Sequence, residues 1–70
     1  MRNIKYVVYQ EGQYFVSQCL NVDISSFGDS VDEAVFNLKD AVELYLKEEP
    51  NIHGYIDVGD ALIGEATIHA

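Results

Sequence analysis

The side chains that could carry chemistry are few in this chain of 70 residues, and they are scattered along it. His53 and His69 stand alone, because neither has a second ligand at the spacing of a zinc site. Cys19 is the single cysteine, and a lone thiol in an apolar stretch usually packs as a small hydrophobe unless a base activates it. We therefore expect no metal site, no cofactor and no catalytic nucleophile.

The carboxylates gather in two places. Asp29, Asp32 and Glu33 surround the start of a predicted helix, where negative charge is favourable. Residues 57–60 hold two more carboxylates, but they lack the D-x-[DN]-x-[DN]-G spacing of a calcium loop. A metal-dependent nuclease using Asp29 or Asp32 is the enzymatic alternative. Since the helix start accounts for both residues, the sequence predicts a protein that is not an enzyme.

One long helix organises the chain. Ser30 and Glu33 fit a capping box, in which the Ser30 hydroxyl accepts from the Glu33 N–H and Glu33 reaches back to the Ser30 N–H. Pro50 cannot continue a helix, so the predicted helix covers residues 31–48. Its apolar residues recur with the helical period and form one stripe: Val31, Ala34, Val35, Leu38, Ala41, Val42 and Tyr45.

Three apolar residues fall outside the expected core. Phe36 lies almost opposite the helical stripe, Leu44 lies off its edge, and Tyr9 belongs to a second partly apolar face of the first strand. Isolated exposed apolar residues are common in folded proteins. The alternative is a contact surface for a twin subunit or another protein. We take Tyr9, Phe36 and Leu44 as candidate contact residues.

Strands are predicted before the helix. Residues 4–10 are rich in β-branched and aromatic side chains, and Gly12 marks a hairpin turn to a second strand over residues 13–20. Residues 21–27 are predicted to form a third strand. The expected arrangement is a three-stranded antiparallel meander with the helix packed across one face.

The pattern weakens after the helix. Residues 51–60 are predicted to be mostly loop, with a possible short strand over residues 55–58. Residues 61–69 alternate between small or apolar and polar side chains, which predicts a last strand. That strand could pair with the sheet of its own chain or with that of a second subunit. The predicted class is α+β, in the order β-β-β-α-β.

Size and charge limit the possible functions. The chain is expected to be one domain over residues 1–70, and domains this small often gain stability as dimers or tetramers. Its formal charge is −8, which repels phosphate backbones and argues against direct nucleic-acid binding. A basic protein partner would suit this charge, and solubility alone would also explain it.

No targeting or membrane segment is evident. No apolar run has the length needed to cross a membrane, and the first residues lack a signal-peptide pattern. The single cysteine excludes an internal disulfide and fits a reducing compartment. We therefore expect a cytoplasmic protein.

Residues 14–47 contain an ordered series of short motifs. In order, these are Tyr14-Phe15-Val16, Gly28-Asp29-Ser30, Asp32-Glu33-Ala34, Asn37-Leu38-Lys39, Ala41 and Glu43-Leu44-Tyr45-Leu46. The series resembles the HicB-type antitoxin family. Many relatives carry a Pro-x-x-x-Gly-Cys segment between the second and third strands, whereas in this chain residues 19–23 replace it, as in a shorter branch of the family.

The resemblance implies a partial RNase H-like fold without the nuclease carboxylates. It also implies an antitoxin that binds and blocks a small basic RNA-cleaving toxin of the HicA type. Masking would be steric and electrostatic, because the antitoxin would cover the active site of the toxin. The alternative is a homo-oligomeric HicB-like protein with a structural or regulatory role and no toxin partner.

Overall fold

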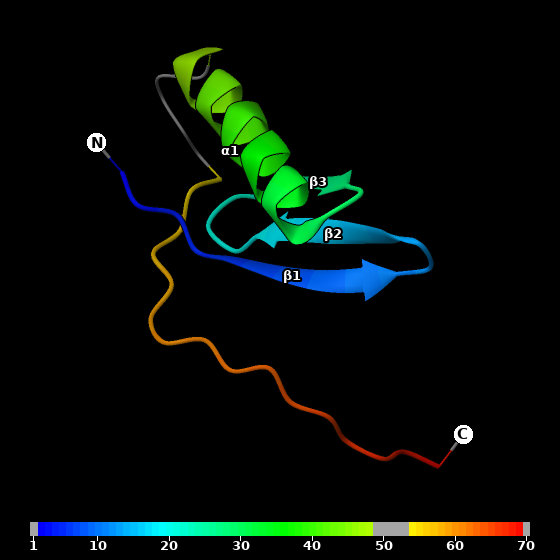
Figure 1. The fold of residues 1–70 in the computed structure, drawn as a ribbon. Helices are drawn as coiled ribbons and strands as arrows, with labels where there is room; N and C mark the ends of the chain where they lie inside the picture. The colour runs from blue at the N-terminus through cyan, green and yellow to red at the C-terminus, as the bar shows by residue number, and fades with distance from the viewer. Residues whose placement is uncertain (1, 49–53, 70) are drawn as a thin grey trace.

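The computed structural model describes residues 2–48 and 54–69. Three strands come first and one helix follows: β1 (Tyr6–Glu11), β2 (Tyr14–Cys19), β3 (Ser25–Gly28) and α1 (Val31–Glu48). The strands form an antiparallel sheet in the order β1-β2-β3, and α1 crosses one face of it (Figure 1). The α+β class and the three-stranded meander are therefore confirmed.

The turn at Gly12 fixes which residues face each other across the sheet. Gly12 has a φ of 63°, a conformation that side chains with a Cβ disfavour, and it closes a hairpin in which Glu11 pairs with Tyr14. Every later pair follows from this register, including Val8 with Ser17. Since paired residues share a face, the turn determines which side chains point toward α1.

The third strand is shorter than the sequence predicts. It covers four residues rather than the expected 21–27. Residues 21–23 form a bend instead, closed by bonds from the Ile24 N–H to the Val22 carbonyl and from the Cys19 N–H to the Ile24 carbonyl, each 2.9 Å. The chain therefore turns tightly where an extended strand was expected, and Asn21 is left facing inward.

The predicted helix is confirmed from its first residue to its last. The Ser30 Oγ accepts a hydrogen bond from the Glu33 N–H at 3.1 Å, as a capping residue should. The Glu33 carboxylate reaches back one residue further than expected, to the Asp29 N–H at 2.7 Å. Two backbone donors at the helix start are thereby satisfied.

The core lies between α1 and the neighbouring part of the sheet. Leu38 is completely buried at its centre, and Ser17 beneath the helix donates a hydrogen bond from Oγ to the Ala34 carbonyl at 2.7 Å. Cys19 is a free, buried thiol. The buried apolar residues are Cys19, Val22, Ala34, Leu38 and Val42. Because α1 packs mainly on β2 and β3, the helix-facing side of β1 is poorly covered.

The segment that follows the helix is hydrogen-bonded to the domain at Ile56 and extends away from it after Gly59 (Figure 1). Asn21 bonds to both main-chain groups of Ile56, through its own carbonyl at 2.9 Å and its Nδ2 at 2.8 Å. The same side chain accepts a bond from the Lys5 N–H at 2.7 Å. Beyond Gly59 the chain runs away from the domain as an extended coil (Figure 1).

The predicted last strand over residues 61–69 is not formed in the single chain, and neither is the possible short strand over residues 55–58. A strand requires a neighbour to complete its hydrogen bonds, and neither segment pairs with the sheet. Residues 49–53, which include Pro50, His53 and the first part of the predicted loop, lie outside the described residues. Within the described part of the chain, no helix is long and apolar enough to cross a membrane.

Candidate partner-binding surface

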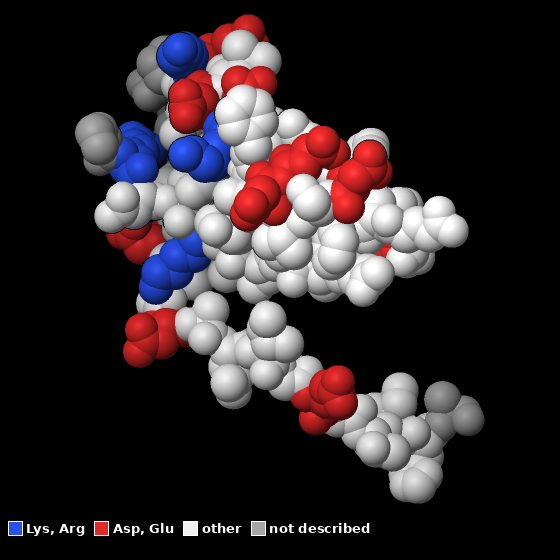
Figure 2. Space-filling view, in the orientation of Figure 1, with Lys and Arg blue, Asp and Glu red and all other residues white. Residues whose placement is uncertain are grey.

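The outer face of α1 combines negative charge with one exposed aromatic ring. Helical periodicity places Phe36 opposite the buried stripe, and its side chain is 69% exposed. Acidic residues lie around it on the same face, and Figure 2 shows their red atoms gathered over the helix. We call this surface the acidic helix face; it consists of Asp32, Glu33, Phe36, Asp40 and Glu43.

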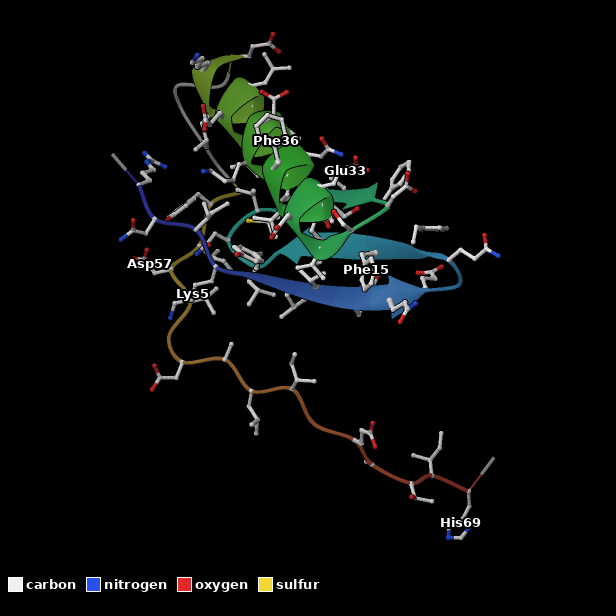
Figure 3. All side chains as sticks on the ribbon, viewed as in Figure 1. Lys5, Phe15, Glu33, Phe36, Asp57 and His69 are labelled. Carbon is white, nitrogen blue, oxygen red and sulfur yellow. The ribbon has the colours of Figure 1, made fainter. Side chains whose placement is uncertain are left out.

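The local sequence dictates this arrangement. The buried stripe occupies one side of the helix, and residues three or four apart share a side. Asp32, Phe36, Asp40 and Glu43 follow that spacing on the solvent side. In Figure 3, Phe36 projects from the helix away from the sheet. The helix cap therefore accounts for the bonds of Glu33, but nothing within the described chain accounts for the exposed ring.

A ring surrounded by carboxylates suits a cationic ligand. A guanidinium or ammonium group can stack on the face of Phe36 and bond a neighbouring carboxylate at the same time. Arginine fits such a site better than lysine, because its planar group both stacks and makes paired hydrogen bonds. The acidic helix face is therefore chemically complementary to an arginine- or lysine-rich protein surface.

The structure does not bring the three predicted contact residues together. Leu44, 58% exposed, lies on α1 to one side of the acidic helix face. Tyr9 lies on the opposite side of the sheet, because its partner Val16 alternates with Ser17, which faces the helix. Phe36 and Leu44 can contact one partner together, whereas Tyr9 belongs to a different surface.

Tyr9 shares that surface with two aromatic residues that the sequence did not single out. Tyr14 and Phe27 are exposed, and their ring centroids lie 5.6 Å apart on the side of the sheet that no helix covers. We call Tyr9, Tyr14 and Phe27 the aromatic sheet face. The hairpin register, counted outward from Gly12, could have placed Tyr9 and Tyr14 on one face, whereas Phe27 joins them only through the pairing of β2 with β3.

The basic residues lie beside the acidic helix face rather than within it, and Lys39 and Lys47 border it because each is four residues from Glu43. They are the four residues Arg2, Lys5, Lys39 and Lys47, and Figure 2 shows them in blue toward one end of the molecule. Arg2, Lys39 and Lys47 line an open groove beside the second half of α1. The Arg2 guanidinium lies 4.9 Å from the centroid of the Tyr55 ring. This end of the domain is thus held partly by a cation–π contact.

The described residues that were considered for catalysis lie in different parts of the fold. The Asp29 N–H donates to the Glu33 carboxylate at the helix cap, and Asp32 is exposed in the first turn of α1. Cys19 is buried in the core, and His69 is exposed near the end of the chain (Figure 3). Within residues 2–48 and 54–69, no group of three or more His, Cys, Asp or Glu side chains is placed to hold a metal ion.

No protein-family model, curated protein or solved structure matches the chain. The structure itself defines a small α+β domain with an acidic, partly apolar helix face.

Proposed function

We propose that this protein is a non-catalytic binding module that masks a small basic RNA-cleaving toxin of the HicA type. The supporting observation is the acidic helix face, where carboxylates surround the exposed Phe36. This proposal includes a HicB-like, partial RNase H-like fold for the domain. The motifs at residues 14–47 that resemble HicB-type antitoxins support that part of it.

Charge and shape play different roles in the proposed complex. A net charge of −8 attracts a basic protein over a distance of about 8–10 Å at ordinary salt and speeds encounter. Phe36 supplies an aromatic anchor, and such residues often provide most of the binding free energy. The complex should therefore associate quickly, weaken with salt and depend strongly on one ring.

The test is complex formation with a small basic protein encoded next to the gene for this chain. We expect a stoichiometric complex by native mass measurement, and we expect RNA cleavage by that protein to stop when the complex forms. Absence of any such neighbouring protein, or failure of the two to bind, would overturn the proposal.

Two variants on the acidic helix face and one control variant locate the interface. Phe36→Ala should weaken binding by about 2 kcal/mol or more, as loss of an interfacial aromatic anchor does, while leaving the fold intact. Asp40→Asn should slow association and reduce its salt dependence. Asp23→Asn removes the same charge from the exposed β2–β3 connection and should do neither. Equal effects of the two Asp variants would place the interface elsewhere.

The second candidate function is a homo-oligomeric module with a structural or regulatory role. The aromatic sheet face supports it, because three exposed aromatic residues on an uncovered sheet form a natural contact surface. A homodimer or homotetramer without a basic companion would favour this candidate. A monomer at micromolar concentration would argue against it.

A further inference from the structure

Gly59 is the last residue before the C-terminus that is hydrogen-bonded to the rest of the described domain. Before this residue the chain is tied to the domain: the Tyr55 hydroxyl donates to the Asn3 carbonyl at 3.1 Å, and the Lys5 Nζ donates to the Gly59 carbonyl. After it, residues 60–69, which we call the C-terminal tail, are all exposed. None of the hydrogen bonds found within residues 2–48 and 54–69 involves the tail.

The tail has the composition of a strand that buries one face. Leu62, Ile63 and Ile68 are 93%, 76% and 78% exposed, which leaves three large apolar side chains in water. In an extended chain, alternate residues share a side. One side of the tail consists of Leu62, Gly64, Ala66 and Ile68, and the other has three polar residues, Glu65, Thr67 and His69, beside Ile63. The apolar side needs a covering surface, and the extended backbone needs hydrogen-bond partners.

The outer edge of β1 offers both. It is an end strand of the sheet, so every second residue directs its N–H and C=O groups away from β2 without a partner. Tyr6 and Val8 lie on its helix-facing side, where α1 gives little cover. Apolar side chains of a neighbouring strand could therefore pack beside Tyr6 and Val8 and extend the core layer.

The other free edge is less suitable. β3 has four residues, compared with six in β1, and so provides fewer hydrogen-bond partners. Asp23 and Asp29 flank β3, and both would repel the carboxylates of the tail. At β1, the positive charge of Lys5 immediately before the strand offsets the negative charge of Glu11 at its end, so this edge carries no net charge. Length and charge both favour β1.

We propose that the C-terminal tail of one copy adds as a strand to the β1 edge of a second copy, and that the second copy returns its own tail. A second copy is the chosen occupant because, in the single chain, the tail leaves beside Lys5 and extends away without joining its own sheet (Figure 1). Reciprocal exchange of an identical segment closes a two-fold dimer. Main-chain pairing supplies the binding, and the alternating side chains fix the register.

This dimer is independent of the proposed toxin partner, because it uses β1 and the tail and leaves the acidic helix face free. It also differs from a dimer through the aromatic sheet face, which would leave both tails in solvent. The proposed toxin complex and the proposed tail-exchanged dimer can therefore each be refuted without the other.

The first test compares two adjacent substitutions in the full chain by sedimentation equilibrium. Ile68→Asp places a charge on the apolar side of the tail, and Thr67→Asp places the same charge on the polar side. Both residues are exposed in the single chain, so neither change threatens folding. We expect the unmodified protein to be a dimer, Ile68→Asp to raise its dissociation constant at least about tenfold, and Thr67→Asp to change it by less than about threefold. Equal effects of the two variants would overturn the proposal, as would a monomeric unmodified protein.

The second test measures hydrogen exchange of the tail amides at several protein concentrations. Exchange of strands between copies predicts that residues 61–69 become protected as the dimer forms. Unprotected tails in a dimer would overturn the proposal and indicate contact through another surface. Protection that is independent of concentration, in a monomer, would also overturn it, because the tail would then be closing on its own β1.

Discussion

Asn21 offers the sharpest test of how this fold is held together. Its side chain is 3% exposed and joins two segments that are distant in sequence. The Oδ1 atom accepts from the Lys5 N–H at 2.7 Å, and Nδ2 donates to the Ile56 carbonyl at 2.8 Å. Asn21→Ala removes both side-chain bonds and keeps only the main-chain bond from the Ile56 N–H to the carbonyl of residue 21.

The magnitude follows from the number of bonds and the groups left behind. A typical hydrogen bond contributes about 1 kcal/mol net, and stranding a partly buried partner adds to the loss. Lys5 and Ile56 are themselves exposed residues, so water can recover part of that penalty. We therefore expect Asn21→Ala to lower the free energy of unfolding by about 2–3 kcal/mol. That is a large share of the roughly 5–15 kcal/mol that stabilises ordinary domains.

The matched control is Asn37→Ala. Asn37 is half-buried on α1, and its Nδ2 makes one side-chain bond, to the Phe27 carbonyl at 2.9 Å. Its loss should cost about 1 kcal/mol or less. Urea unfolding followed by circular dichroism at 222 nm, at one fixed protein concentration, gives both values. Equal destabilisation by the two variants would refute the assigned role of Asn21.

Two further predictions concern packing. Leu38→Ala should lower the free energy of unfolding by about 2–5 kcal/mol, because Leu38 is fully buried. Leu44→Ala, on the exposed side of the same helix, should lower it by less than about 1 kcal/mol, and thermal unfolding of the two variants measures the difference. Gly28→Ala should destabilise by about 1–3 kcal/mol, because its new Cβ would lie 2.7 Å from the Ala34 nitrogen. Gly59→Ala, which meets nothing within 4 Å, should be neutral or slightly stabilising, and a similar loss in both glycine variants would contradict this account.

Local patterns were sufficient for the helix. Ser30 satisfies a backbone donor at its start, and Pro50 follows the last turn, so both ends of α1 are encoded within a few residues. The buried positions Ala34, Leu38 and Val42 also follow directly from the helical period. The hairpin was readable for the same reason, because Gly12 alone supplies the conformation that the turn requires.

The bounds of the third strand and the candidate surfaces could not be predicted from local sequence patterns. Residues 21–27 do not predict that the Asn21 side chain points into the fold, because its hydrogen-bond partners Lys5 and Ile56 are far away in the sequence. Tyr9 was identified as a contact candidate from one strand, but its neighbours Tyr14 and Phe27 emerge only when strands are placed in register. The groove lined by Arg2, Lys39 and Lys47 likewise joins the N-terminal segment to the second half of α1.

The sequence by itself determined the class, the helix and the hairpin, because each depends on residues close together in the chain. Tertiary structure alone decided that, among residues 2–48 and 54–69, nothing covers the aromatic sheet face and nothing pairs with the tail. The alternation of residues 61–69 predicts a strand, but a strand exists only where another backbone completes its hydrogen bonds. Whether that backbone is present depends on the arrangement of the whole molecule rather than on the nine residues themselves.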